Sequence, residues 1–225
     1  MLIATVGLGA LTALAVWQYW PAAVLPVALW LFVMAFFRDP RRIALFARGE
    51  LCSPADGKVT EITRLDHHEK IGGPAVRIGI FLGIFDVHAN RSPCRGRVVS
   101  VTYARGRFLD ARNPKSGRLN ESNTLLIDPN PPVAGPIIVR QIAGLIARRI
   151  TCRAMEGDDL MIGERFGMIK FGSRTELIIP DRAETEIKTW VGQSVRAGIS
   201  VVAVQRSNLS SGGSHARYSE TEQPA

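Results

Sequence analysis

The sequence has 225 residues, of which 46% are hydrophobic, and its formal net charge is +8. This length suits one apolar anchor followed by one domain of ordinary size. The three cysteines, Cys52, Cys94 and Cys152, lie far apart and form no C-x-x-C pair. Neither a zinc-finger site nor a disulfide framework is therefore supported, and small buried thiols in a reducing compartment are expected.

The first 37 residues contain no charged side chain. A single helix of that length would be about 55 Å long, whereas the hydrocarbon core of a bilayer is about 30 Å thick. The polar segment 17–21 divides the run into apolar pieces at 2–16 and 22–37, which predicts a membrane-anchoring helical hairpin. The arginine cluster at 38–42 places both ends in the cytoplasm by the positive-inside rule. A cleaved signal peptide fits poorly, because no basic region precedes the apolar run.

The positive charge indicates an anionic partner. Next to an apolar N-terminus, an anionic membrane surface is favoured over nucleic acid, because clustered basic residues beside an anchor attract lipid headgroups. The sequence has no aromatic RNA-binding pattern and no helix-turn-helix signature. We therefore expect no nucleic-acid partner.

The remainder of the chain predicts a mainly β domain over residues 38–206. Segments rich in Val, Ile and Phe, separated by Gly, Pro and Asn, are typical of strands and turns. They occur at 75–83, 96–104, 123–129, 135–144, 167–180 and 200–206. A helix is expected only at about 143–149. The polar, Ser/Gly-rich tail 207–225 is expected to be disordered.

Two internal repeats suggest how the strands are arranged. Residues 53–62 and 92–101 share the pattern S-P-x-x-G-[KR]-V, and residues 157–169 and 192–204 share two glycines six residues apart followed by a strand. Paired hairpins of this kind predict a compact β-sandwich or barrel. The second pattern is similar to the hammerhead turns of biotinyl and lipoyl carrier domains.

Few residues carry recognisable chemistry. His88 ends an apolar run and is either a partly buried structural residue or an acid–base group. Asp56 lies in an Asp-Gly turn, which by itself accounts for the residue type. Gly172 and Ser173 interrupt a strand-like stretch, and a hydroxyl without assistance is a poor nucleophile. The sequence contains no H-E-x-x-H, P-loop, G-x-G-x-x-G or G-x-S-x-G motif, so these residues alone assign no reaction.

Taken together, four motifs carry a resemblance to a known family. "FFRDP", "SPADGKV", "FDVHANRSP" and "KFGSR" follow one another behind the apolar hairpin. This combination resembles the short prokaryotic type of phosphatidylserine decarboxylase over roughly residues 20–206. The long type has L-G-S-T where this chain has F-G-S-R.

The resemblance implies a zymogen that cleaves itself between Gly172 and Ser173. The β chain would be 1–172 and the α chain 173–225, and the two chains would stay together. Ser173 would become a covalent pyruvoyl group, the enzyme's pyruvate cofactor, which forms a Schiff base with the substrate. The implied enzyme is a carboxy-lyase of phospholipid biosynthesis that converts phosphatidylserine into phosphatidylethanolamine and CO2.

The resemblance also implies roles for three further residues. Asp56 and His88 match the family's Asp and His by their S-P-x-D-G and V-H contexts, and Asp56 could orient His88 as in a catalytic triad. Arg91 stands where the long type has a second histidine, and it is a candidate for binding an anionic part of the substrate. No metal ion is implied. The expected location is the inner cell membrane, with the catalytic domain on the cytoplasmic side and phosphatidylserine taken from the bilayer.

Alternatives remain open at this point. The main one is a membrane-anchored, carrier-like hammerhead adaptor without catalysis, for which Lys170 is the nearest candidate attachment site. A membrane-bound serine peptidase that uses Ser173, or a pyruvoyl decarboxylase with another amine substrate, would fit less well. A homo-oligomer is among the partners that the sequence leaves open.

Overall fold

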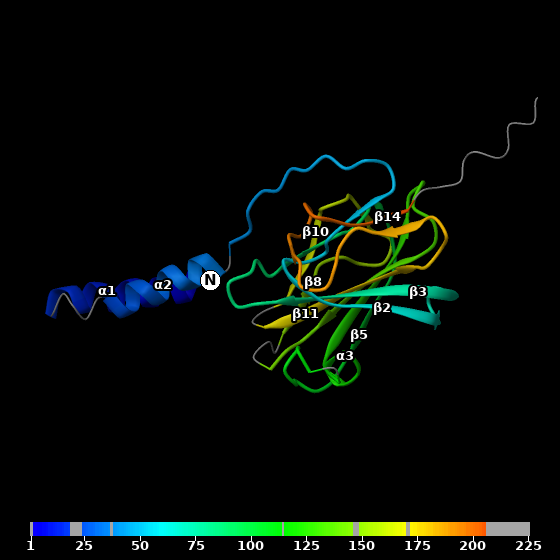
Figure 1. The fold of residues 1–225 in the computed structure, drawn as a ribbon. Coiled ribbons are helices and arrows are strands. Elements are labelled where there is room, and N and C mark those ends of the chain that lie inside the picture. The colour runs from blue at the N-terminus through cyan, green and yellow to red at the C-terminus, as the bar shows by residue number, and fades with distance from the viewer. Residues whose placement is uncertain are drawn as a thin grey trace, which may run out of the picture.

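The computed structural model describes residues 2–18, 24–36, 38–113, 115–145, 149–169 and 172–205. Within these residues the fold is mainly β, with a curled sheet like a half-barrel and a short N-terminal pair of helices (Figure 1). The predicted fold class is confirmed. The predicted disordered tail and Lys170 lie outside the described residues.

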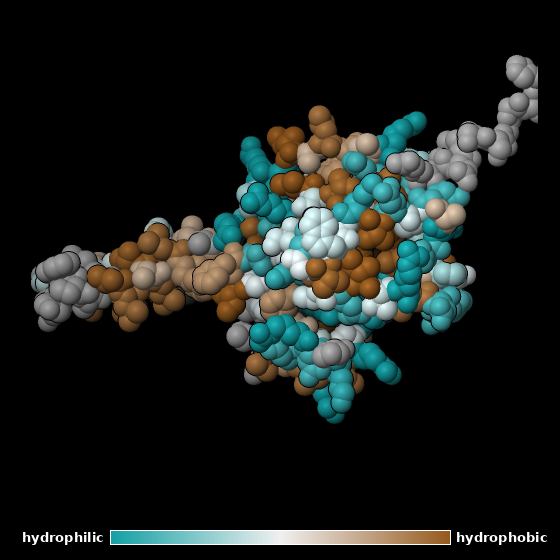
Figure 2. Space-filling model, viewed as in Figure 1, coloured by the Kyte–Doolittle hydropathy of each residue, from teal (hydrophilic) through white to brown (hydrophobic). Residues whose placement is uncertain are grey.

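The two helices form the hairpin that the apolar N-terminus predicted. Helix α1 (Leu2–Gln18) and helix α2 (Val24–Phe36) pack against each other and project from one side of the β domain (Figure 1). Apolar side chains cover both helices, whereas the surface of the β domain is mixed (Figure 2). No helix in the described ranges combines the length and hydropathy that crossing a membrane requires.

The β domain contains one large antiparallel sheet and two small ones. The large sheet has eight strands in the order β13-β2-β3-β11-β7-β6-β5-β9, and the small sheets have the orders β1-β14-β12 and β4-β10-β8. The strands and the one short helix of this domain are β1 (Glu50–Cys52), β2 (Gly57–His68), β3 (Gly73–Leu82), β4 (Ala89–Arg91), β5 (Gly96–Ala104), α3 (Ser116–Leu119), β6 (Ser122–Pro129), β7 (Ile137–Ile142), β8 (Ile150–Cys152), β9 (Asp159–Leu160), β10 (Arg165–Ile169), β11 (Ser173–Pro180), β12 (Thr185–Ile187), β13 (Ser194–Val195) and β14 (Val201–Gln205).

Two local predictions need correction. The segment 167–180, expected as one interrupted strand, belongs to two strands of different sheets, β10 and β11, and Gly172–Ser173 lies where β11 begins. The helix expected at about 143–149 is not formed at 143–145 or at 149, and 146–148 lie outside the described residues. Apolar runs as short as this one fit strands and helices alike, so periodicity gave no reliable assignment.

The sequence repeats correspond to structural repeats. Gly57 at the start of β2 pairs with Val195 of β13, and Gly96 at the start of β5 pairs with Leu160 of β9 in the same way. Each repeat has its register shift two residues later, between Val59 and Glu61 in one strand and between Val98 and Ser100 in the other. The residue before each S-P-x-x-G segment also donates a backbone hydrogen bond to the proline of the other segment, from Cys52 N to Pro93 O and from Arg91 N to Pro54 O. The hammerhead-like hairpins are therefore present twice.

The hydrophobic core lies inside the curl of the large sheet. It includes Ile78, Ile80 and Leu82 of β3 and Leu177 and Ile179 of β11, all fully buried. Strand β11 is buried at every position because β3 and β7 flank it and side chains cover both of its faces. Ser173 is therefore the first residue of the most enclosed strand in the domain.

Candidate active site

Ser173 is held in a fully buried position next to a glycine of unusual conformation. Its backbone pairs with Leu82 of β3, and its hydroxyl is buried without a hydrogen-bond partner among the described residues. Gly172 has a φ of +58°, a backbone conformation that costs free energy for any residue with a Cβ. A buried hydroxyl without a partner is rare in proteins and calls for an explanation.

The carbonyl group of Gly172 lies directly against a second glycine. A Cβ added to Gly144 would overlap the carbonyl oxygen of Gly172, far inside van der Waals contact. No side chain other than hydrogen therefore fits at position 144 while the carbonyl keeps this direction. The sequence alone did not single out Gly144, because its role depends on a neighbour 28 residues away in the chain.

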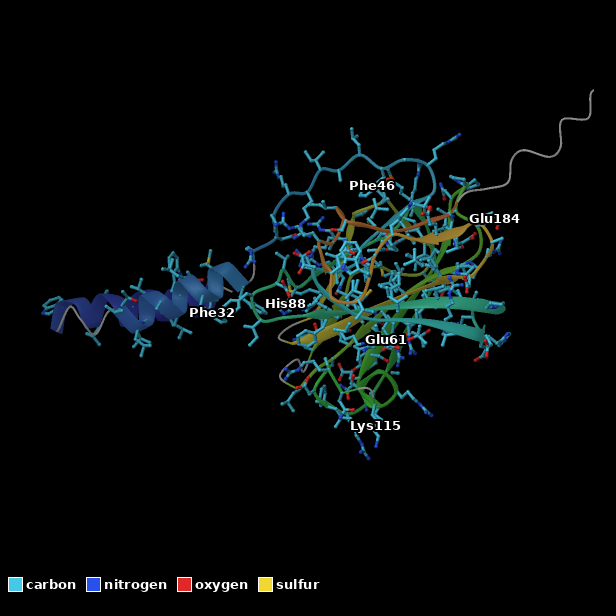
Figure 3. The ribbon with its side chains drawn as sticks, in the orientation of Figure 1. Phe32, Phe46, Glu61, His88, Lys115 and Glu184 are labelled. Carbon is cyan, nitrogen blue, oxygen red and sulfur yellow. The ribbon has the colours of Figure 1, made fainter. Side chains whose placement is uncertain are left out.

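His88 lies just before β4 and is fully buried, at the end of the β domain that faces the helical pair (Figure 3). Its Nδ1 lies 2.8 Å from the backbone oxygen of Asp86, and its ring centroid lies 4.4 Å from that of Phe36 in α2. A carbonyl only accepts, so Nδ1 carries the proton and Nε2 keeps its lone pair. Nε2 is buried and has no partner among the described residues.

Burial lowers the pKa of His88 below its ordinary value of 6.5, and the hydrogen bond to the Asp86 carbonyl opposes this only in part. The imidazole is therefore neutral at pH 7. A neutral imidazole with a free Nε2 can accept a proton, which is what activation of a hydroxyl requires.

A chain of buried polar side chains connects the strand that follows His88 to the strand that begins at Ser173. Asn90 donates to Thr175 Oγ1 at 3.0 Å and accepts from Gln141 Nε2 at 2.9 Å, and Gln141 in turn accepts from Asn123 at 3.0 Å. Asn90 lies two residues after His88, and Thr175 lies two residues after Ser173. The bond between Asn90 and Thr175 joins β4, which begins one residue after His88, to β11, which begins at Ser173. Sequence reasoning missed these residues, since their only signal was polar residue types inside apolar segments.

Asp56 is buried in the first S-P-x-x-G turn and is bound by other partners. Both of its oxygens accept hydrogen bonds from the guanidinium of Arg42, and Oδ1 also accepts from Ala197 N at 2.8 Å. Arg42 in turn donates to Ala197 O at 2.7 Å. The triad-like arrangement, in which Asp56 binds His88, is not formed by these contacts: Nδ1 of His88 is occupied by the backbone of Asp86.

Arg91 is occupied by the linker after the helices. Its guanidinium contacts Asp39 at 2.6 Å, Gly163 O at 2.9 Å and Pro40 O at 3.3 Å. Asp39 is also bound by Arg165 at 2.8 Å. In this conformation Arg91 fixes the linker to the domain, so the substrate-binding role expected from the sequence has no support in its contacts.

Comparison with known proteins identifies the family of this chain. The family model for phosphatidylserine decarboxylase matches residues 29–203. A phosphatidylserine decarboxylase proenzyme of Rhodopirellula baltica is 48% identical over 194 residues, which cover 86% of this chain and 80% of the relative. Proteins of the same name from Syntrophus aciditrophicus and Carboxydothermus hydrogenoformans are 44% and 43% identical, covering 86% and 88% of this chain and 90% and 91% of theirs. The chain belongs to the phosphatidylserine decarboxylase family.

The protein is thus a decarboxylase, a carboxy-lyase, and the family relationship confirms the resemblance seen in its motifs. The described residues contain no cluster of three His, Cys, Asp or Glu side chains that could hold a metal ion. The cysteines are free, and burial raises the pKa of the Cys52 thiol to about 12, so this thiol is protonated at neutral pH.

On the opposite face of β11, the decarboxylase holds a cluster of charges. Arg174, the residue after Ser173, contacts Glu61 of β2 at 2.5 Å and Glu176 at 3.1 Å, and Arg77 binds Glu61 at 2.6 Å. The guanidinium of Arg174 lies over Gly79, where a Cβ would obstruct it. The cluster therefore fixes the backbone immediately after the Gly172–Ser173 bond.

Proposed function

We propose that this decarboxylase cleaves itself between Gly172 and Ser173, and that the pyruvoyl group so formed at residue 173 decarboxylates phosphatidylserine to phosphatidylethanolamine and CO2. The observation that carries the proposal is the buried, unpartnered hydroxyl of Ser173 directly after a glycine with positive φ. Relatives that are named proenzymes support it.

The cleavage is an exchange of bonds within the chain. The Ser173 oxygen attacks the carbonyl carbon of Gly172, the peptide C–N bond breaks, and the hydroxyl proton moves to the released amine. The resulting ester is eliminated: the Cα proton of residue 173 is lost and the Gly172 carboxylate leaves. Water then replaces the nitrogen, ammonia is released, and a ketone remains at the start of the α chain. No oxidant or reductant is needed.

The residues around this bond suit such a reaction. His88, neutral and with a free Nε2, is the proposed base that takes the hydroxyl proton. Gly144 leaves space beside the Gly172 carbonyl, so the carbonyl can be held at the angle that attack requires. Asp56 contributes by fixing Arg42 and the 196–198 turn, rather than by contacting His88.

The pyruvoyl ketone supplies an electrophile for the substrate amine and an electron sink for decarboxylation. It would be held by the backbone pairing of residue 173 with Leu82 and by the buried environment of His88. That environment excludes water, and the imidazole can return a proton to the carbon that loses CO2.

We also propose that the helical pair keeps the enzyme on the cytoplasmic face of the inner membrane. Large apolar side chains of both helices are exposed, among them Leu11, Trp17, Leu25 and Leu31. Arg38 and Arg41 follow immediately, are exposed, and suit anionic headgroups. A substrate with two acyl chains stays in the bilayer, so an enzyme acting on its headgroup works best at that surface.

Intact mass measurement of the purified protein tests the proposal. We expect the wild-type chain to separate into two species divided between Gly172 and Ser173, with a ketone at the start of the smaller one. Ser173→Ala should give a single 24.6 kDa chain that releases no CO2. Ser100→Ala removes a serine hydroxyl from β5, outside the site, and should cleave like the wild type.

Two results would contradict the proposal. Cleavage of the Ser173→Ala chain at the same bond would remove Ser173 from the reaction. An intact wild-type chain that releases no CO2 from phosphatidylserine would favour the adaptor without catalysis.

A further inference from the structure

A cavity of about 390 Å³ opens beside the proposed cleavage bond. Gly172 forms part of its wall, together with Phe81, Ile84, Phe85, Leu145 and Arg112. The walls are thus largely apolar, and Arg112 is the one cationic residue that the described residues contribute to them. Pockets that bind small molecules typically combine apolar walls with a few such polar groups.

Arg112 is held in place at this cavity without being buried. Asp110 accepts from its Nη2 at 2.7 Å and from its Nε at 3.1 Å, and its guanidinium lies 5.9 Å from the centroid of the Phe81 ring. Its side chain is 72% exposed. A guanidinium has five N–H donors, and Asp110 engages two of them, so Arg112 can bind a second anion.

The lip of the cavity is apolar and lies next to the helices. Ile84 and Phe85 form the tip of a tight turn that Asp86 closes by accepting from Gly83 N at 2.7 Å. Phe85 and Leu145 are 78% and 61% exposed. Arg38, two residues after the end of α2, donates to Phe85 O at 2.7 Å. The lip is therefore tied to the end of the helical pair that the proposed function assigns to the membrane.

Apolar side chains, one cation and Gly172, the residue before Ser173, all line this cavity. A glycerophospholipid carries groups that match these: acyl chains and glycerol, an anionic phosphodiester, and a headgroup amine. We propose that Arg112 binds the phosphodiester of the substrate, while Ile84, Phe85 and Leu145 contact its glycerol and upper acyl carbons. Asp110 is a positioning residue that orients the guanidinium. This inference rests on the proposed function and adds the residue that selects a phosphorylated substrate.

The test compares Arg112→Ala with Arg64→Ala. Arg64 is a matched control. Like Arg112, its side chain is 72% exposed and pairs with an aspartate, Asp181, at 2.7 Å. Arg64 lies on β2 and does not line the cavity. Each variant is first checked for complete chain cleavage. Decarboxylation is then measured on phosphatidylserine dispersed in detergent. We expect KM to rise about tenfold or more in Arg112→Ala, the size expected for one charge-assisted contact, and Arg112→Lys to lie between Arg112→Ala and wild type.

A binding measurement gives a readout that does not depend on turnover. The uncleaved Ser173→Ala protein is titrated with glycerophosphoserine, and the phosphorus resonance of the ligand is followed. Adding Arg112→Ala should weaken this binding about tenfold, whereas adding Arg64→Ala should leave it unchanged.

The outcomes separate this inference from the proposed function. If Arg112→Ala and Arg64→Ala behave alike in a cleaved, active enzyme, the phosphodiester site is wrong and the proposed function stands. If the wild type neither cleaves nor decarboxylates, the proposed function itself has failed. Equal weakening of glycerophosphoserine and of L-serine by Arg112→Ala would also overturn the inference, because L-serine has no phosphate.

Discussion

The two S-P-x-x-G segments, 53–62 and 92–101, fold alike but contact different partners. In both, the serine hydroxyl donates to the backbone oxygen two residues later, Ser53 at 2.6 Å and Ser92 at 2.7 Å. In both, the serine carbonyl accepts from a hammerhead glycine at 2.9 Å, Gly198 in the first and Gly163 in the second. The backbone of this turn is thus determined by the serine, the proline and the glycines that the segments share.

The difference lies in two positions that the shared backbone leaves free. Where the first segment has Asp56 and Glu61, the second has Arg95 and Ser100. Asp56 binds Arg42 from the linker, and Glu61 binds Arg174, the residue after Ser173. Two segments with the same backbone thus bind different partners: the acidic residues of the first attach it to the linker after the helices and to β11.

The largest expected change in stability comes from replacing Asp56, and Arg95, its equivalent in the second segment, serves for comparison. Asp56→Ala leaves the Arg42 guanidinium, whose side chain is only 6% exposed, without its carboxylate, and this should lower the free energy of unfolding by about 3–5 kcal/mol. Arg95 is exposed, so Arg95→Ala should change it by less than about 0.5 kcal/mol. Urea denaturation in detergent, with Ser173→Ala present to keep the chain whole, measures both.

A double substitution then separates structure from chemistry. Arg42→Met with Asp56→Leu should recover most of the lost stability, because an apolar pair can replace a buried ion pair. If cleavage recovers as well, Asp56 acts only by holding the fold. Persistent failure to cleave in a stable double variant would instead give Asp56 a chemical role. Equal stability of Asp56→Ala and Arg95→Ala would contradict the comparison.

Glycines of the two hammerhead turns give a smaller contrast. Gly198 and Gly163 have φ values of +66° and +76°, so alanine is strained at either position by about 1 kcal/mol. At Gly198 the new Cβ would also lie 3.0 Å from Arg91 Cδ and 3.2 Å from Gly163 Cα, whereas at Gly163 its nearest contact is 3.6 Å. We expect Gly198→Ala to cost about 2 kcal/mol and Gly163→Ala about 1 kcal/mol. Thermal unfolding would show equal shifts if the neighbours of Gly198 move aside freely.

The smallest expected effect is a change in acid stability. Partial burial alone raises the pKa of Glu61, but hydrogen bonds from Arg174, Thr63 and Arg77 outweigh it and lower the pKa from 4.5 to about 2. Because the folded pKa is lowered, Glu61 stabilises the fold above pH 4.5, and this contribution is lost as the pH falls from 4.5 through 2. Glu61→Gln should flatten the loss of stability over that range, whereas Ser100→Ala should not. Identical urea midpoints against pH for wild type and Glu61→Gln would exclude this ion cluster as an acid-sensitive element.

Local patterns were enough to predict the repeated hairpins and the helical pair, because each depends on residues close together in the sequence. The partners of the polar residues could not be predicted in this way. Asp56 is bound by Ala197, 141 positions away, and Arg91 by Asp39, 52 positions away. Such pairs follow from strand order, which no single segment specifies. Gly144 and Arg112 could not be predicted for the same reason, because their proposed roles depend on residues that are distant in the sequence and close in the fold.

The place of β11 between β3 and β7 has a consequence for how the enzyme is made. Every strand after the proposed cut, β11 to β14, would belong to the C-terminal piece, yet β11 pairs on both sides with strands of the N-terminal piece. A chain that ends before residue 173 lacks β11. Two separately made pieces would therefore each expose unpaired sheet edges. We therefore expect assembly to require one continuous polypeptide. After the cut, the nicked halves would remain a single particle, held together by main-chain hydrogen bonds on both sides of β11.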